Sequence, residues 1–270
     1  GYFAIEGQIG IGGMGAVYRG RHEVLGRLAA IKVLERSSVS PDLVERFRRE
    51  AAALSRISHA NIVRFLEWGE EGDLAFYAMD LVEGTPLDER IRSGPLPERE
   101  GLRIVESIAR ALNQAHEIGI LHRDLKPSNV VIRRDGEPVL LDFGLARIVS
   151  VEIESLTGTG IALGTPFYMS PEQAMGDKAR IDRRTDVYSL GVILYECLSG
   201  VKPFTGKSVV DLLKAIQSEA PVPLRARAPG ISPGTEAICS IAMARDPDDR
   251  PWNAALLADS LAELRRRLGD

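Results

Sequence analysis

Apolar runs typical of strands dominate the first third of the chain, and helical periodicity dominates the rest. From Tyr2 to about Leu34 the residues alternate and cluster as short strands around a glycine-dense turn between Gly10 and Tyr18. Residues 75–84, AFYAMDLVEG, also have strand composition. Helical periodicity recurs in residues 97–118, 186–199, 208–218, 234–244 and 253–268. This pattern predicts an α+β fold in which a small β-rich lobe precedes a larger α-helical lobe.

One main helix is expected within the β-rich part. Ser40, Pro41 and Asp42 supply an N-cap, a first-turn proline and an early acidic residue. Apolar side chains then recur on one face, at Leu43, Phe47, Ala51, Leu54 and Ile57. Glu50 lies on the edge of this apolar stripe, where a carboxylate needs a positive partner or must be neutral. Glu50 therefore predicts a nearby buried cation, unless it is a solvated helix residue.

The junction between the two parts is Gly84-Thr85-Pro86, which looks like a hinge. We expect a single domain over residues 1–270, with a small lobe at 1–79, a hinge at 80–84 and a large lobe at 85–270. Gly119 and Gly200 follow helical segments as C-terminal caps. No internal repeat or low-complexity linker divides the chain further.

The composition of the chain excludes several classes of protein but does not identify a function. The 270 residues are 44% hydrophobic and 27% charged, with a formal net charge of −4. These values exclude a disordered tail, a collagen-like rod and a disulfide-stapled miniprotein. Because binding to a phosphate backbone requires a basic surface, we expect no nucleic-acid partner.

The two cysteines and the chain ends bear on compartment and context. Cys197 lies in an apolar stretch, so we expect a buried free thiol, no disulfide with Cys239, and a reducing, cytoplasmic setting. The longest uncharged apolar run, Val187–Tyr195, is far below the roughly 18 residues of a membrane helix. Since the chain starts at Gly1 without a methionine, we expect a domain cut from a longer protein.

A predicted hairpin places two oxygen-bearing side chains together. The segment NVVIRRDGEPVLLD, from Asn129 to Asp142, has two apolar runs around Asp135-Gly136, which is typical of a two-residue turn. That turn would set Asn129 opposite Asp142, with their Cα atoms about 5 Å apart. An amide oxygen and a carboxylate could hold a hard cation there. Alternatively, both residues cap strand ends.

The motifs around this hairpin carry a resemblance. HRDLKPSN, residues 122–129, lies just upstream. The others are GIGGMGAV at residues 10–17, AAIK ending at Lys32, DFGLAR beginning at Asp142 and SPE at residues 170–172. In order and spacing they resemble the protein kinase signature set over essentially the whole chain, although a glycine-rich loop alone would be weak evidence. GTPFYMSPEQ and DVYSLGV look most like the bacterial Ser/Thr kinases of the eukaryotic-like type.

This resemblance implies the two-lobed protein kinase fold and transfer of the γ-phosphoryl group of ATP to protein hydroxyls. It implies that Asp124 accepts or orients the proton of the acceptor hydroxyl and that Lys126 steadies the γ-phosphate. Asn129 and Asp142 would hold Mg²⁺ or Mn²⁺. Lys126 within HRDLKPSN favours Ser/Thr over Tyr acceptors, so the implied partners are ATP and protein Ser/Thr substrates.

For the nucleotide, the resemblance implies that Lys32 holds the α/β-phosphates and is oriented by an ion pair with Glu50. The loop glycines would let the backbone approach the triphosphate, with Met14 at the tip. The implied ATP-binding residues are Ile9, Gly10, Gly12, Gly15, Val17, Ala30, Lys32, Met79, Asp80, Val82, Val131 and Leu141.

Residues 142–172 resemble an activation segment. Thr157 and Thr159 stand where bacterial relatives carry a phosphorylated threonine pair, and Arg123 is the arginine that typically meets such a phosphate. Autophosphorylation in trans would involve a homodimer. The alternative to a phosphorylated activation segment is an unmodified flexible loop.

Four further residues have implied scaffold roles. Thr165 would lie near Asp124, Glu172 would pair with Arg250, and Asp186 would anchor the backbone of the catalytic loop, residues 122–129. Ser170 departs from the commoner alanine of the family but is small enough to leave the Glu172 pair undisturbed.

Two other functions compete with an active protein kinase. A pseudokinase scaffold should lack Lys32, Asp124, Asn129 or Asp142, and none is missing. A small-molecule phosphotransferase generally lacks the long segment ending in SPE, which docks a peptide, and this chain has it. Many bacterial relatives cross a membrane, so the full-length protein could be anchored by a segment outside this sequence.

Overall fold

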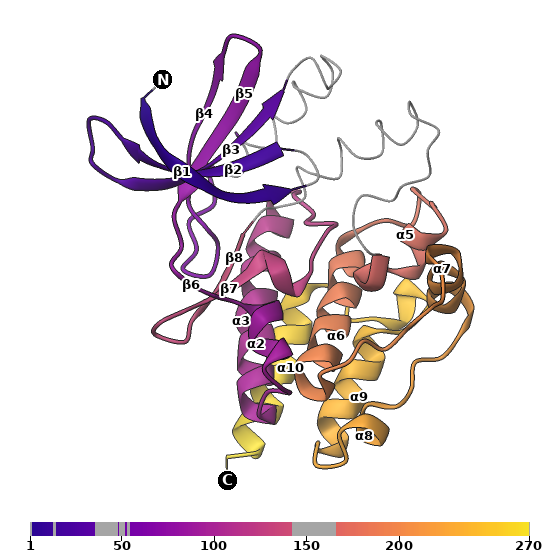
Figure 1. Cartoon of the computed structure of the whole chain (residues 1–270). Coiled ribbons are helices and arrows are strands. Elements are labelled where there is room, and N and C mark those ends of the chain that lie inside the picture. The colour runs from indigo at the N-terminus through magenta and orange to yellow at the C-terminus, as the bar shows by residue number, and fades with distance from the viewer. Residues whose placement is uncertain are drawn as a thin grey trace.

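The computed structural model describes residues 2–12, 15–35, 48, 52, 55–141 and 166–269, and these form two lobes. An antiparallel sheet forms one lobe, and helices with a small second sheet form the other (Figure 1). The α+β architecture expected from the hydrophobic pattern is therefore confirmed.

The first sheet has five strands in the order β1-β2-β3-β5-β4, and all neighbours are antiparallel. Its strands are β1 (Phe3–Gly12), β2 (Gly15–His22), β3 (Leu28–Glu35), β4 (Phe65–Glu71) and β5 (Leu74–Asp80). Side chains alternate between its faces, so Ala29 and Ile31 of β3 join one apolar cluster while Ala30 joins another. Lys32 shares the face of Ala30 by the same alternation.

The helix expected after Ser40 lies mostly outside the described residues. Arg48 and Ala52 are described within it, and both are helical. Glu50, the carboxylate for which a buried cation was expected, is outside the described residues.

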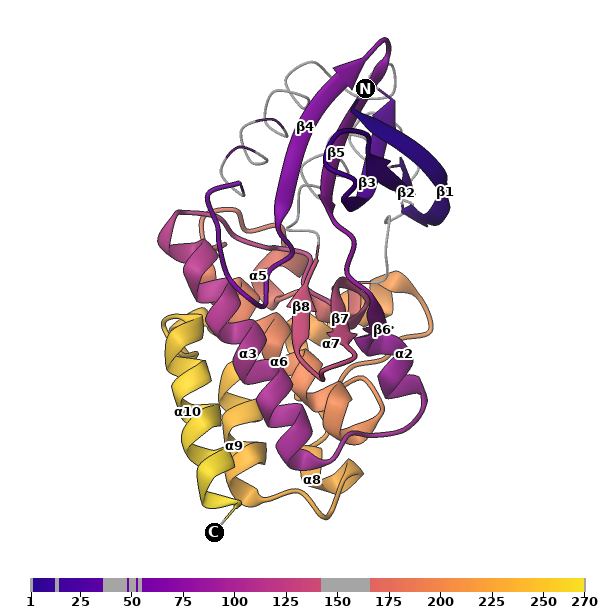
Figure 2. The ribbon, with the colours of Figure 1, turned by 90° about the vertical axis from the view of Figure 1, so that its left-hand side faces the viewer.

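The second lobe is built on a long helix, α6 (Arg183–Ser199), which is buried on nearly every side. Asp182 caps its N-terminus by accepting from the Arg184 N–H, and Gly200 ends it in the left-handed conformation. Other helices surround it, with α3 and α10 side by side (Figure 2). They are α2 (Leu87–Arg92), α3 (Glu98–Glu117), α5 (Pro171–Ala174), α7 (Val209–Ser218), α8 (Leu224–Arg227), α9 (Pro233–Ala242) and α10 (Ala254–Arg267).

The five predicted helical segments are confirmed, with ends displaced by at most three residues. Cys197 and Cys239 are both buried and free, as expected for thiols in an apolar core. Among the described residues, no helix has both the length and the apolar character needed to span a bilayer.

The predicted register of the hairpin is wrong by one residue. In the second sheet, β7 (Val130–Arg133) pairs with β8 (Pro138–Leu140) so that Val130 faces Leu140. The turn contains three residues instead of two: Gly136 N donates to Arg133 O at 2.9 Å and Arg133 N donates to Glu137 O at 3.0 Å. Gly136 has φ +84°, as a glycine closing a three-residue turn requires.

Asn129 consequently lies beside Leu141, whose N–H donates to its carbonyl at 2.7 Å. Asp142 is outside the described residues. The hairpin is also extended on its other edge, because β6 (Gly84–Pro86) pairs with β7. Gly84-Thr85-Pro86 thus forms a short strand of the helical lobe, and residues 81–83 connect it to β5.

Candidate functional site

The loop that follows α3 is held by a buried carboxylate of α6. Asp186 accepts from the backbone N–H groups of His122 and Arg123, both at 2.8 Å. The Nε2 atom of His116 lies 2.7 Å from its Oδ2, and both side chains have no exposed surface. Burial opposes ionisation of Asp186, but the hydrogen bond and charge of His116 hold the pKa of this carboxyl below its usual range. The expected anchoring of the catalytic loop by Asp186 is present.

Backbone strain marks the position before Asp124. Arg123 has φ +62° and is the one non-glycine residue with a positive φ in the part of the chain that the structure describes. L-residues avoid this region at a cost of about 1–2 kcal/mol, so the anchored N–H groups must hold the loop in this shape. The bend continues through Asp124 N, which donates to His122 O at 2.8 Å.

The polar side chains of the loop converge on Asp124. Lys126 Nζ lies 2.9 Å from Asp124 Oδ2, and both side chains are about one-third exposed. Asn129 Nδ2 donates to the Asp124 carbonyl at 2.9 Å, within the short helix η2 (Pro127–Asn129). The neighbouring Leu125 is buried, which fixes the loop to the core. Asp124 therefore presents an ordered carboxylate to solvent beside a cation.

The residues expected to bind adenine do come together in part. Ala30 and Met79 are buried in one apolar cluster, with Val17 packed against it. The register explains this, because Ala30 pairs with Met79 across β3 and β5. Val131 is 6% exposed on β7 of the other lobe. Asp80 ends β5, and Val82 and Leu141 are half-buried.

Lys32 is 6% exposed, and its Nζ lies 5.8 Å from the centre of the Tyr77 ring. The strands β1 and β2 approach it as a glycine-rich hairpin in which Gly12 pairs with Gly15 and Gly10 with Val17. A Cβ added at Gly10 would meet only the Val17 side chain, at 3.9 Å, so the space over this strand is open. Ile9, on β1, is 51% exposed.

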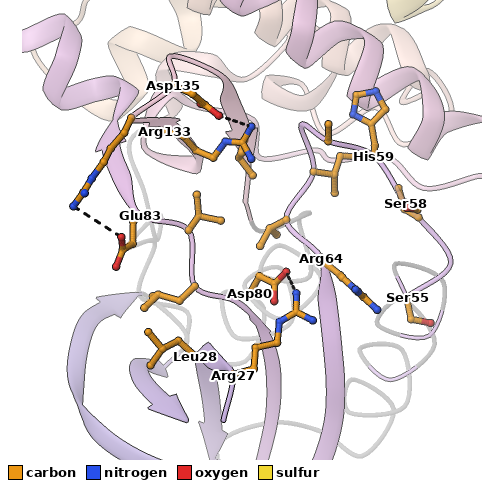
Figure 3. A pocket seen from close by; sticks show the side chains of 18 of the residues that line it. Arg27, Leu28, Ser55, Ser58, His59, Arg64, Asp80, Glu83, Arg133 and Asp135 are labelled. Atoms are coloured by element: carbon orange, nitrogen blue, oxygen red, sulfur yellow. Dashed lines mark hydrogen bonds and ion pairs between the residues drawn. The ribbon is translucent and has the colours of Figure 1, made fainter. Parts of the chain in front are cut away.

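A cavity of about 1270 Å³ lies at the connection between the lobes but not at the catalytic loop. It contains Asp80, Leu81 and Val82, and it is lined further by arginines paired with acids. Figure 3 shows two of these pairs, Arg27 with Asp80 and Arg133 with Asp135. Lys32, Asp124 and Asn129 do not line it, so this cavity is separate from the catalytic loop.

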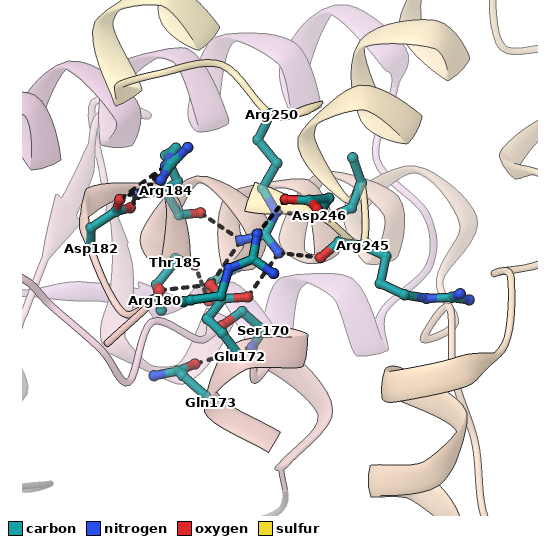
Figure 4. A network of polar contacts seen from close by, with 12 residues as sticks. Ser170, Glu172, Gln173, Arg180, Asp182, Arg184, Thr185, Arg245, Asp246 and Arg250 are labelled. Carbon is teal, nitrogen blue, oxygen red and sulfur yellow. Dashed lines mark hydrogen bonds and ion pairs between the residues drawn. The ribbon is translucent and has the colours of Figure 1, made fainter. Parts of the chain in front are cut away.

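The expected pair of Glu172 and Arg250 is present and buried. Arg250 Nη1 and Nη2 donate to the two carboxylate oxygens of Glu172, both at 2.8 Å (Figure 4). Thr185 Oγ1 adds a third bond to Glu172 at 2.7 Å. Burial raises the pKa of Glu172, but the hydrogen bonds and charge of Arg250 outweigh it and leave this pKa below its usual range.

Several predicted site residues lie outside the described residues. They are Glu50, Asp142, Thr157, Thr159 and Thr165. Their predicted roles stay predictions.

Two residues that hold the loop were not predicted. His116 lies on the buried face of α3, where a lone polar residue in the apolar stripe is the available signal. Gln173 donates from Nε2 to the Arg123 carbonyl at 2.9 Å and so connects α5 to the catalytic loop. No sequence pattern marks this contact.

The described residues fit ATP and a divalent cation. Because the Asn129 amide nitrogen is directed at the Asp124 carbonyl, its Oδ1 is the atom that could ligate a cation beside the Asp124 carboxylate. The buried Lys32, the open glycine hairpin and the apolar pair Ala30 and Met79 supply a cation, close backbone and a flat wall for a nucleotide.

Comparison with known proteins agrees with this geometry. The protein kinase domain family model matches residues 3–261. The chain is 42% identical over 269 residues to serine/threonine-protein kinase pkn2 of Myxococcus xanthus, covering 97% of this chain and 32% of that protein. It is 37% identical over 262 residues to PknB of Mycobacterium tuberculosis, covering 95% and 42%. The chain thus spans less than half the length of these two relatives.

A solved structure is similar as well. The crystal structure of the Mycobacterium tuberculosis PknI kinase domain aligns with a TM-score of 0.77 at 29% identity, over 97% of this chain and 96% of that one. The anchored loop, the ordered Asp124 and the family match lead to one conclusion: this chain belongs to the protein kinase domain family, whose members use ATP and a divalent metal ion.

Proposed function

We propose that this chain transfers the γ-phosphoryl group of ATP to serine and threonine hydroxyls of proteins. The observation that carries the proposal is the carboxylate of Asp124, held 2.9 Å from Lys126 on a loop anchored by Asp186. The names of the relatives pkn2 and PknB as serine/threonine-protein kinases support the choice of acceptor.

Each residue of the candidate site would have a role in phosphoryl transfer that follows from its charge and position. Asp124 would orient the acceptor hydroxyl and take its proton, and Lys126 would neutralise charge that develops on the transferred phosphoryl group. Lys32 would hold the other phosphates from the sheet lobe. ATP would supply the phosphoryl group. A bound divalent ion, for which we propose Mg²⁺, would neutralise charge on the phosphate oxygens. Asn129 and Asp142 would hold that ion.

The test is transfer to protein acceptors, followed by phosphoamino-acid analysis. We expect the wild-type chain with Mg²⁺ and ATP to place phosphate on serine and threonine of casein, and we expect an Asp124→Asn variant to place almost none. A chain that phosphorylates a sugar or an aminoglycoside better than any protein would contradict the proposal. Nucleotide binding without transfer to any acceptor would indicate a scaffold instead.

We further propose that the chain phosphorylates its own Thr157 or Thr159 and that Arg123 contacts the resulting phosphate. The positions of both threonines in the motif pattern support this. Intact mass and peptide mapping after incubation with ATP should show phosphate on these residues. Full activity of the Thr157→Ala/Thr159→Ala double variant would contradict a regulatory role.

Transfer between two copies of the chain would imply at least a transient homodimer. Mixing the active chain with a longer, tagged Asp124→Asn chain should label the inactive copy. Labelling of the active copy alone would show transfer within one molecule.

We also propose a reducing, cytoplasmic setting, which the two free, buried thiols support.

A further inference from the structure

We propose that Lys202 sets the acceptor preference of this kinase: it offers a cation to acidic side chains of the acceptor segment, and it covers Glu196, which would otherwise attract basic ones. The inference rests on the proposed kinase function. It is drawn from a cluster of charged and aromatic side chains between α6 and the short helix η3 (Pro166–Tyr168).

The short helix η3 lies close to the loop that carries Asp124. The Ser189 hydroxyl of α6 donates to the Tyr168 carbonyl at 2.8 Å, which fixes η3 to the core of the helical lobe. The chain then enters α5, where Gln173 bonds the carbonyl of Arg123, the residue before Asp124. In Figure 1, α5 lies at the end of the helical lobe that faces the sheet. A peptide whose hydroxyl reaches Asp124 therefore has η3 within its reach.

The Glu196 carboxylate is covered by two donors. Its carboxylate accepts from the Tyr168 hydroxyl at 2.6 Å and from Lys202 Nζ at 2.9 Å. Burial of the phenol and the nearby Glu196 charge raise the pKa of Tyr168 far above its usual range, so this hydroxyl remains a donor. The Glu196 side chain is 9% exposed and that of Lys202 is 30% exposed. The surface therefore presents the ammonium and hides the carboxylate.

The Lys202 ammonium is held beside the aromatic rings of η3. Its Nζ lies 4.9 Å from the centre of the Phe167 ring and 6.0 Å from that of Tyr168, which are both residues of η3. Two aromatic faces and a carboxylate hold the ammonium in place. An ammonium has three N–H donors, and the bond to Glu196 uses one. Lys202 can therefore bind an incoming carboxylate without releasing Glu196.

One further carboxylate acts on η3, and it is itself paired. Asp88 of α2 is near enough to act on Tyr168, but its carboxylate accepts from Arg92 at 3.1 Å. An acidic acceptor segment thus meets the partly exposed Lys202 ammonium at η3. On α7, which packs against η3, the exposed Asp211 carboxylate accepts from the Ser208 hydroxyl at 2.9 Å.

A positional-scanning peptide library tests the proposal, with Lys207→Met as the matched control because Lys207 is an exposed lysine on the same loop. For the wild-type chain we expect Asp and Glu to be favoured at one position near the acceptor by about 2–5-fold, the effect of a partly exposed ion pair. Lys202→Met should lose this preference and favour Lys and Arg at the same position, because Glu196 is uncovered. Lys207→Met should behave as the wild type.

A second variant separates recognition from structural support. Lys202→Met/Glu196→Gln should show no charge preference at that position, since both charges are gone. If Lys202→Met instead lowers the rates for all peptides equally and leaves their ranking unchanged, Lys202 is structural and the proposal is wrong. A wild-type chain that phosphorylates peptides without any acidic preference would also overturn it. Failure to phosphorylate any peptide or protein would overturn the proposed function itself.

Discussion

Arg250 and Glu172 join two distant parts of the helical lobe, because the guanidinium meets both carboxylate oxygens at 2.8 Å with neither side chain more than 1% exposed. Three backbone carbonyls, those of Ala244, Arg184 and Arg245, accept the remaining Arg250 donors. The arrangement fixes α5, and with it the segment that reaches Arg123, to the lobe (Figure 4).

We expect Arg250→Met to lower the free energy of unfolding by about 3–5 kcal/mol, because it leaves the Glu172 carboxylate buried without its partner. Urea unfolding measures this. Arg92→Met is the control, since Arg92 is 69% exposed in its pair with Asp88 and should cost at most about 1 kcal/mol. The Glu172→Met/Arg250→Met double variant should recover part of the loss. Equal stability of Arg250→Met and Arg92→Met would contradict the account.

Acid should destabilise the fold through the buried carboxyls. The pKa values of Glu172 and Asp186 lie below their usual values, so both groups stabilise the folded state above their unfolded pKa of about 4. This contribution is lost as the pH falls from there through the lower folded pKa values. Urea unfolding between pH 7 and pH 3 should show the loss, with a shallower pH dependence in Asp186→Asn. An identical slope in that variant would show that Asp186 does not take part.

Asp186 should matter for turnover more than for nucleotide binding. Asp186→Asn weakens the bonds to His122 N and Arg123 N that set the position of Asp124. We expect kcat to fall by about 100-fold with little change in KM for ATP, since small displacements of a catalytic group have effects of this size. Asp259→Asn, at an exposed ion pair, is the control. Circular dichroism should establish that both variants are folded. A higher KM for ATP with an unchanged kcat would contradict the prediction.

The three-residue turn can be tested at its glycine. Gly136→Ala places a side chain at φ +84°, where an L-residue costs about 1–2 kcal/mol, and we expect unfolding to become easier by that amount. Gly7→Ala is the control, because an added Cβ there has nothing within 4 Å and Gly7 has no positive φ. Equal effects of the two substitutions on urea unfolding would argue against the left-handed turn.

Hydrophobic periodicity predicted most of the fold. Alternation and helical spacing depend on burial alone, so the strand-rich start and the five later helices could be inferred without tertiary information. The register of β7 and β8 could not, because Asp135-Gly136 suits both a two-residue turn and the last two positions of a three-residue turn. Which turn forms depends on contacts outside the hairpin, such as the bond from Arg103 Nη2 to Gly136 O at 2.6 Å.

Within the candidate site, only the residues that belong to the sequence motifs could be predicted. Asp124, Lys126 and Asn129 are close in sequence, and their contacts follow from one loop. His116 and Gln173 reach that loop from distant elements, so their roles depend on how α3 and α5 pack. The cluster of Lys202, Glu196 and Tyr168 was missed for the same reason.

The Asp124 carboxylate should be essential for phosphoryl transfer to protein hydroxyls. The most direct measurement compares the rate of phosphate transfer to casein by the wild type, Asp124→Asn and Asp135→Asn, where Asp135 is an exposed turn residue 57% open to solvent. We expect Asp135→Asn to match the wild type and Asp124→Asn to be slower by about 10²–10⁴-fold, the usual contribution of a general base. Transfer by Asp124→Asn at the wild-type rate would contradict the account.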